Sequence, residues 1–152
     1  MQLKLALAAA GLAAGVLGAV QPVQAAVCVL LPLITGQLGP PTSNDTQLSS
    51  EDQGGRQATF TVAVVGSSTI TVSAPDVVYN GQHPHSGDTP AIKYTATGLL
   101  GVKKQQPYTA LASTFGISTL DGTVTATVDG KINNSSGFPQ GDYTLRTVVT
   151  CS

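Results

Sequence analysis

Two histidines separated by one residue are the part of the sequence whose spacing best suits metal ligands. They are His83 and His85 in the stretch NGQHPHSGDTP, and the chain has no other histidine. In an extended segment residues i and i+2 point to the same side, so both imidazoles can face one Cu²⁺ or Zn²⁺ ion. Asp88 or Asp76 could add an oxygen ligand. Structural zinc sites take four ligands and catalytic ones three, so a solvated polar turn is the alternative interpretation.

The residue types that perform acid–base or nucleophilic catalysis occur without the patterns that catalysis needs. The sequence contains no G-x-S-x-G motif, which would hold a serine nucleophile on a sharp turn. Asp121, Asp129 and Asp142 each adjoin a glycine. Asp-Gly and Gly-Asp pairs form turns far more often than they act as acids or bases. The sequence therefore predicts a protein that is not an enzyme and carries no cofactor.

The two cysteines, Cys28 and Cys151, lie near opposite ends of the chain. In an oxidising compartment they are expected to form a disulfide; two free thiols or an intermolecular bridge are the alternatives. A disulfide requires Cα atoms within roughly 7 Å. We therefore expect a first strand at 27–34 to lie beside or opposite a last strand at 143–151.

Residues 1–25 have the layout of a secretory signal peptide. Lys4 precedes an apolar run, and VQA ends at Ala25, where a signal peptidase would cut. The run is short for a membrane span of about 20 residues, and no second run follows it. We expect residues 26–152 to form one exported domain without a membrane span, located outside the cell, in the periplasm or on the cell surface.

Composition narrows the function classes further. Seven Lys and Arg face eight Asp and Glu, and one of the seven, Lys4, belongs to the expected leader. Such a chain lacks the basic face that nucleic-acid binding requires. Charged residues make up 10% of the chain, and Thr, Val, Ser and Gly are abundant, as is typical of β-rich secreted domains.

Short runs of alternating apolar and polar residues predict strands that bury one face. Gly66-Ser67 is expected to join two of these runs as a hairpin, and Asp121-Gly122 to join another pair. Asp129-Gly130 is expected to end a strand or start a turn. The residues expected to face the core are Phe60, Val62, Val64, Ile70, Val72, Ile92, Tyr94, Ala96, Val124, Ala126 and Val128, followed by Tyr143, Leu145, Thr147, Val149 and Cys151.

Three stretches rich in turn residues predict loops. The first, 35–56, is expected to be a long flexible excursion. The others are the polar stretch 80–90 and the stretch 133–142, which leads into the last strand.

The closing stretch GDYTLRTVVTCS, preceded by SGFPQ, resembles the last strand of small secreted bacterial β-sandwich proteins, the pilin-like and spore-coat-U-like domains. Gly141, Tyr143 and Val149 carry the resemblance, together with AVCVL after the leader. The resemblance implies an immunoglobulin-like sandwich that is exported to the envelope, serves in surface fibres or coats, and performs no catalysis.

These observations predict an all-β, immunoglobulin-like antiparallel β-sandwich of about seven strands. The expected function is that of a non-enzymatic structural or adhesive protein of the cell surface or envelope. Its expected partners are other surface proteins or glycans, and it is expected to be monomeric unless assembled on the surface. The alternative is a soluble secreted module that binds a glycan, small ligand or metal through the 80–90 loop, with help from Tyr79, Tyr94 and Tyr108.

Overall fold

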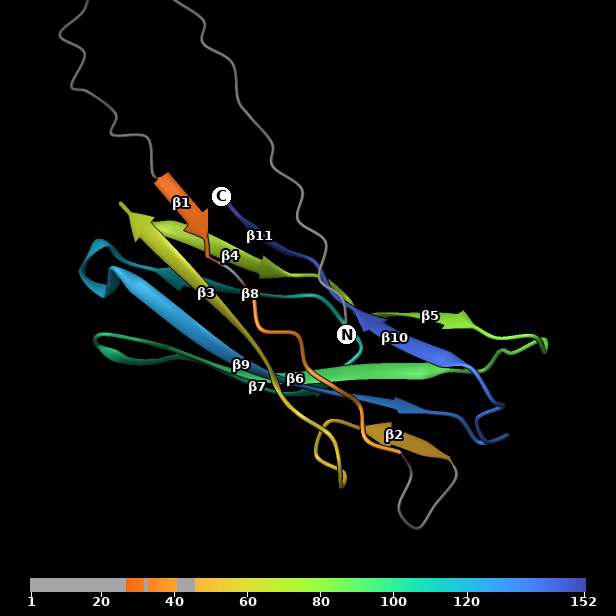
Figure 1. The fold of residues 1–152 in the computed structure, drawn as a ribbon. Helices are drawn as coiled ribbons and strands as arrows, with labels where there is room; N and C mark the ends of the chain where they lie inside the picture. Colours follow the sequence, from red (N-terminus) through yellow and green to blue (C-terminus); the bar gives the residue numbers. More distant parts are fainter. Residues whose placement is uncertain (1–26, 32, 41–45) are drawn as a thin grey trace, which may run out of the picture.

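The computed structural model describes residues 27–31, 33–40 and 46–152, and these residues form antiparallel β-strands with one 3-10 turn (Figure 1). The predicted all-β class is therefore confirmed. The expected signal peptide lies outside the described residues. The elements are β1 (Val27–Leu30), β2 (Gln47–Ser49), β3 (Ala58–Val65), β4 (Ser68–Val72), β5 (Asp76–Asn80), β6 (Thr89–Gly98), β7 (Gly101–Thr109), β8 (Ser113–Ile117), η1 (Thr119–Asp121), β9 (Thr123–Asn133), β10 (Asp142–Arg146) and β11 (Val149–Cys151).

One large sheet forms the first layer, with the strand order β1-β3-β9-β6-β7 and β2 added along β9. Apolar and polar residues alternate along its central strands because one face of the sheet is buried and the other faces solvent. The inward residues of β3, β6 and β9 are those that the alternation predicts, and each is buried: Phe60, Val62, Val64, Ile92, Tyr94, Ala96, Val124, Ala126 and Val128.

Two small sheets, β11-β4-β8 and β10-β5, form the second layer. Strand structure is interrupted between β4 and β5, and the interruption between β10 and β11 lies beside it. Residues in the two interruptions are hydrogen-bonded to each other. The Ser73 N–H donates to the Val148 carbonyl (2.8 Å), and Thr147 Oγ1 donates to the Ser73 carbonyl (2.8 Å). Because these interruptions divide longer strands into shorter ones, the described residues contain more strands than the expected number of about seven.

The core lies between the layers. Buried side chains from both layers belong to one cluster, in which Val62 and Val124 of the large sheet meet Ile70 and Leu145 of the small sheets. This arrangement is compatible with a β-sandwich. The immunoglobulin-like topology stays a prediction.

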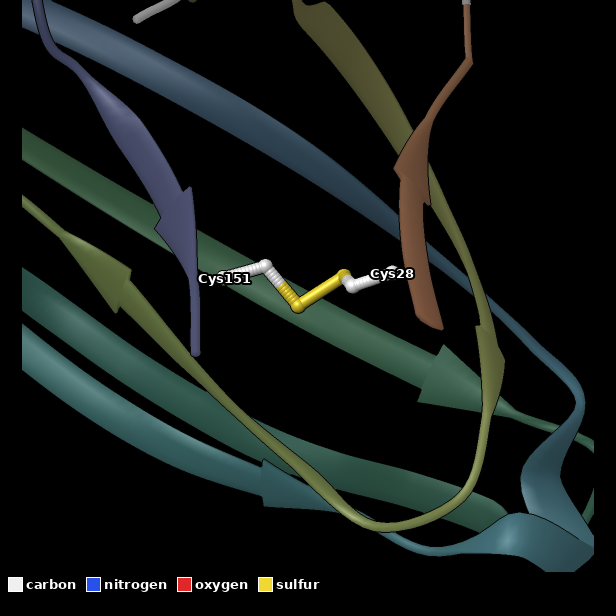
Figure 2. The surroundings of a disulfide bond; sticks show 2 residues. All are labelled: Cys28 and Cys151. Carbon is white, nitrogen blue, oxygen red and sulfur yellow. A yellow bond between two sulfur atoms is a disulfide. The ribbon is translucent and has the colours of Figure 1, made fainter. Parts of the chain in front are cut away.

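The predicted disulfide between Cys28 and Cys151 is present. It joins β1 to β11 across 123 residues of sequence, with a Cα–Cα distance of 6.2 Å (Figure 2). β1 pairs with β3 and β11 pairs with β4, so the first and last strands lie opposite each other in different layers. The disulfide therefore ties the two layers together at their edges.

The expected hairpin at Gly66-Ser67 is wrong. β3 pairs with β1 and β9, whereas β4 pairs with β11 and β8. The two residues, with Gly66 at φ 99°, carry the chain from one layer to the other. A short glycine-containing connection can form either a hairpin or a crossing between layers. Here the crossing lets both Val64 and Ile70 be buried in the core.

The expected hairpin at Asp121-Gly122 is also a crossing between layers, because β8 pairs with β4 while β9 joins the large sheet. Asp121 is buried. Its carboxylate accepts a hydrogen bond from the Ser118 N–H (3.0 Å) and forms an ion pair with Lys103 Nζ (2.6 Å). The interaction with Lys103 is the main cause that lowers the Asp121 pKa to about 2. This aspartate therefore holds η1 against the start of β7.

One further expectation fails because a strand extends through turn-like sequence. β9 continues through Asp129-Gly130, where a Cβ on the glycine would lie 2.4 Å from Leu145 Cδ2. The glycine thus lets the second layer approach.

The stretch 35–56, expected to be a loop, contains β2 and bridges that pair Gln37 with Arg56 and Gly39 with Ser49. Residues 41–45 of that stretch are outside the described residues. The described parts of this stretch are therefore paired in places with the large sheet, and the flexibility of the stretch stays a prediction.

Candidate functional site

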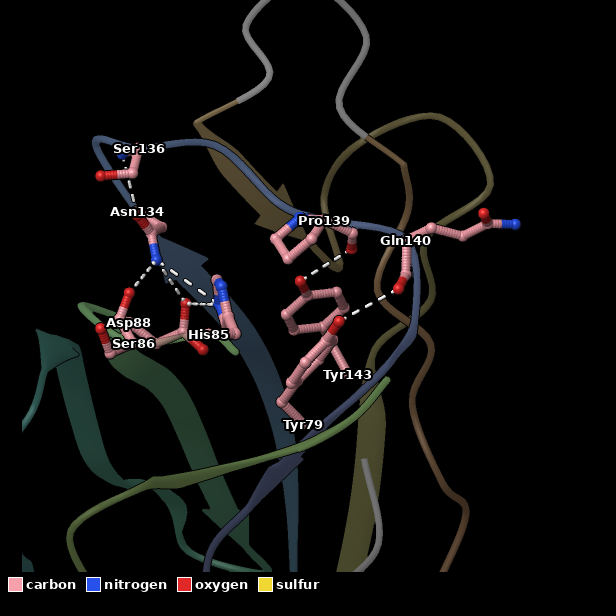
Figure 3. A network of polar contacts seen from close by, with 9 residues as sticks. All are labelled: Tyr79, His85, Ser86, Asp88, Asn134, Ser136, Pro139, Gln140 and Tyr143. Atoms are coloured by element: carbon pink, nitrogen blue, oxygen red, sulfur yellow. Dashed lines mark hydrogen bonds and ion pairs between the residues drawn. The ribbon is translucent and has the colours of Figure 1, made fainter. Parts of the chain in front are cut away.

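The 80–90 loop does not bring its two histidines together as a matched pair. His83 is exposed, whereas the His85 side chain is only 6% exposed. His85 Nε2 lies 2.7 Å from Asp88 Oδ1 (Figure 3). An ionised carboxylate only accepts hydrogen bonds, so Nε2 is the donor. One nitrogen of His85 is therefore already engaged within the loop.

Asn134 connects this loop to the 133–142 loop. Its Nδ2 donates to Asp88 Oδ1 (2.9 Å) and to the Ser86 carbonyl (2.9 Å), while its Oδ1 accepts from the Ser136 N–H (2.9 Å) (Figure 3). Asn134 is buried, and a buried amide is stable only when its donors and acceptors are satisfied. The network explains why this polar side chain is inside.

Aromatic rings complete the cluster. The His85 ring centroid lies 4.8 Å from that of Tyr79 and 5.3 Å from that of Tyr143. The two tyrosine hydroxyls donate to the carbonyls of Gln140 (3.0 Å) and Pro139 (2.9 Å), as Figure 3 shows. Burial is the main cause that raises the Tyr143 pKa to about 12. This cluster joins two loops and leaves the His85 side chain only 6% exposed.

The metal site at His83 and His85 stays a prediction. Asp88 is shared by His85 and Asn134, and Asp76 is exposed at the start of β5. No group of three or more His, Cys, Asp or Glu side chains with the arrangement of a metal site occurs among the described residues. A metal here would have to compete with Asp88 for His85.

The three tyrosines expected to assist the 80–90 loop lie apart. Tyr79 contacts the loop, but Tyr94 is in the core with its hydroxyl 2.7 Å from Ser113 Oγ. Tyr108 lies on the outer side of the large sheet, where its hydroxyl donates to Glu51 Oε2 (2.8 Å). The three tyrosines therefore do not form one surface with the loop, and ligand binding through the 80–90 loop stays a prediction.

The outer face of the large sheet carries a cleft that the sequence did not single out. Its volume is about 490 Å³. It lies where β9, β6 and β7 are neighbours. We call it the outer cleft; its lining residues are Gln57, Lys93, Tyr94, Thr95, Gln105, Gln106, Pro107, Thr127 and Asp129.

Asp129 forms the charged part of the outer cleft. It is buried, and it accepts hydrogen bonds from Ser50 Oγ (2.8 Å) and Gln57 Nε2 (2.7 Å). Lys93 Nζ is 3.7 Å from its Oδ2. A buried carboxylate needs such partners to offset its lost hydration. Asp129 therefore positions Gln57 and Lys93 at the cleft.

A ring of charged and aromatic side chains borders the cleft. Lys93 Nζ lies 2.5 Å from Glu51 Oε1, and Lys131 Nζ lies 4.3 Å from the centre of the Tyr108 ring. The hydrogen bond between Lys93 and Glu51 is the main cause that lowers the Glu51 pKa and raises the Lys93 pKa. Burial raises the pKa of Tyr108. Opposite charges are thus balanced at this border.

The chemistry of the outer cleft is that of hydrogen bonding. Three glutamine amides, two threonine hydroxyls, an ammonium and a carboxylate line it, and its lining contains no histidine, cysteine or serine. The sequence signal was present in the polar positions of KYTAT and TATVD, which alternate with the buried ones. It was missed because only pairing of β6, β7 and β9 makes these positions neighbours.

No family model, no curated protein and no solved structure matches this chain. No helix among the described residues has the length and apolar character to cross a membrane. Function must therefore be argued from the chain's own geometry.

Proposed function

We propose that this chain is a non-enzymatic, exported adhesive protein of the cell surface or envelope, which binds glycan in the outer cleft. The observation that carries the proposal is the composition of that cleft. Amide, hydroxyl and carboxylate groups at fixed positions on a sheet match the closely spaced hydroxyls of a sugar, which both donate and accept hydrogen bonds.

The size and polarity of the cleft favour a polar ligand. Its volume of about 490 Å³ falls within the roughly 300–1,000 Å³ of small-molecule sites, but such sites are mostly apolar. The glutamine-rich lining would leave an apolar ligand facing unsatisfied amides, which costs binding free energy. A saccharide satisfies them.

The disulfide supports export. Disulfides persist in oxidising compartments and are rare in the reducing cytosol. A domain whose ends are joined covalently also suits exposure outside the cell, because the bond stabilises it by restricting the unfolded chain.

Glycan-array screening followed by calorimetry on the exported protein tests the proposal. We expect binding to at least one saccharide, and we expect Gln105→Ala/Gln106→Ala to weaken it about tenfold or more, since each hydrogen bond contributes about 0.5–1.5 kcal/mol. Gln82→Ala is the matched control, because Gln82 is exposed in the 80–90 loop. Binding that ignores the cleft variants, or an empty array, would contradict the proposal.

A structural role in assemblies is a second candidate function, and the open edges of the sheets favour it. Among the described residues β10 pairs only with β5 and β11 only with β4. A cleft of about 590 Å³ lies at the β10 edge between Thr35 and Arg146. Arg146 Nε is buried, and no described residue is its hydrogen-bond partner. An open edge can pair with a strand of another chain.

Envelope fractionation and light scattering test the structural role. We expect the protein in high-molecular-weight assemblies of the envelope fraction. A monomer at every concentration, recovered only outside the envelope, would count against it.

A further inference from the structure

Exposed aliphatic side chains gather at one end of the molecule. The turn between β6 and β7 presents Leu99, Leu100 and Val102, which are 81%, 61% and 63% exposed. Leu120 of η1, 70% exposed, belongs to the same end, since Asp121 of η1 is ion-paired with Lys103 of β7. We call these four residues the aliphatic tip.

The position of the tip follows from strand pairing. Gly98 pairs with Gly101 to close the β6–β7 hairpin, so Leu99 and Leu100 form its turn. The Val64 N–H donates to the Gly122 carbonyl (2.8 Å), which brings the end of β3 to the same level. Figure 1 shows the β6–β7 turn, η1 and the end of β3 at one end of the sheet.

The fold does not require aliphatic residues at these exposed turn positions. Two-residue hairpin turns usually contain Asn, Asp or Gly, which tolerate the backbone and are hydrated. Here the two turn residues are leucines, and the positive φ (105°) at the end of the turn belongs to Gly101. Aliphatic groups left in water contribute nothing to stability, and a group of them marks an interaction surface.

The charges behind the tip favour one kind of partner. Lys103 and Lys104 follow Val102 directly, and Lys103 is neutralised by Asp121. Lys104 has no ion pair among the described residues, so the base of the tip carries one uncompensated positive charge. Leucines on a convex turn backed by a lysine suit a bilayer, because the apolar groups enter the acyl boundary while the ammonium reaches lipid phosphate.

We propose that the aliphatic tip inserts into the interface of a lipid bilayer, with Lys104 on the headgroups. The interaction is peripheral: only the side chains of the turn pass below the headgroups, where the turn's backbone groups still reach water. This property is separate from glycan binding, because the outer cleft lies further along the hairpin at Gln105 and Gln106.

The absence of tryptophan from the chain permits a direct test. Leu99→Trp places a single fluorophore in the tip. Leu111→Trp is the matched control, because Leu111 is 74% exposed beyond β7, at the other end of the hairpin. Both are made in the exported protein, whose N-terminus is established by mass spectrometry. With phosphatidylcholine–phosphatidylglycerol vesicles we expect blue-shifted emission and quenching by brominated lipid for Leu99→Trp only.

Vesicle flotation measures the affinity. We expect Leu99→Ser/Leu100→Ser to lower the partition coefficient at least about tenfold, since the burial of two leucines is lost. Leu111→Ser should leave it unchanged, and Lys104→Gln should lower it only when phosphatidylglycerol is present. Equal partitioning of the tip variant and wild type overturns the proposal. So does an oligomer, seen by light scattering without lipid, that the tip variant abolishes, because the tip would then join two copies of the chain.

Discussion

At one end of the molecule Leu99, Leu100 and Leu120 are exposed, while at the other end His85, Asn134 and Tyr143 are packed and hydrogen-bonded. From residue type alone one would expect the polar side chains to be the exposed ones, because histidine, asparagine and tyrosine can hydrogen-bond a ligand. The comparison shows that a reactive residue type indicates a site only when its groups are unoccupied. In this chain one nitrogen of His85 is already engaged by Asp88, whereas the aliphatic residues at the other end are exposed.

Removing the disulfide should lower the free energy of unfolding more than any other change, and it should loosen mainly the end of the molecule that carries the aliphatic tip. Cys28 is paired with Val64 and Cys151 with Ile70, close to the Gly66 crossing. We expect Cys28→Ser/Cys151→Ser to lower the free energy of unfolding by about 2–5 kcal/mol, because the unfolded chain gains freedom. Urea denaturation measures this change. Hydrogen exchange should show β1 and β11 losing more protection than β5 and β10; uniform loss would remove the distinction between the ends.

Breaking the polar cluster should cost less and affect the other end. Asn134→Ala leaves Asp88 and the Ser86 carbonyl short of a donor. We expect the free energy of unfolding to fall by about 1–3 kcal/mol, the typical cost of an unsatisfied buried group. Asn80→Ala, at an exposed position, is the control and should stay within about 0.5 kcal/mol of wild type. Equal effects of the two variants would mean that the cluster is not structural.

The ion pair under the tip should make stability depend on acidity. The Asp121 pKa is lowered from 3.8 to about 2 in the folded protein, mainly by Lys103. A lowered pKa adds stability that is fully present above about pH 5 and is lost as the pH falls through about 2. We expect Asp121→Asn to have a shallower decline over that interval than wild type, measured by urea denaturation at successive pH values. Lys103→Gln should behave similarly, and parallel curves for all three proteins would refute the role of the pair.

Exposed His83 should give the smallest effect. We expect His83→Ala to change the free energy of unfolding by less than about 0.5 kcal/mol, as surface substitutions do. Thermal melts with Cu²⁺ or Zn²⁺ add a test of the metal hypothesis. Stabilisation of wild type, absent in His83→Ala/His85→Ala, would show that the loop binds metal despite the bond between His85 and Asp88. Equal melts would remove the metal hypothesis.

The local pattern of the sequence was enough for the all-β class, the buried faces of the strands and the disulfide. Alternation alone identified Val62 and Ile70 as core residues, because a strand exposes every second side chain to the same side. It misjudged Gly66-Ser67 and Asp121-Gly122, since a tight turn and a crossing between layers use the same residues. It also treated Asp129 as a turn residue, although β9 passes through it.

What the sequence by itself determined is therefore which residues are inside and that Cys28 and Cys151 lie together. Alternation and two cysteines are local or composition-level features, and they do not depend on strand order. Only the tertiary structure decided that His85 is occupied by Asp88, that Gln57 and Gln105 share a cleft, and that Leu99 and Leu120 share an end. These facts depend on which strands become neighbours, and strand pairing is selected by the core as a whole.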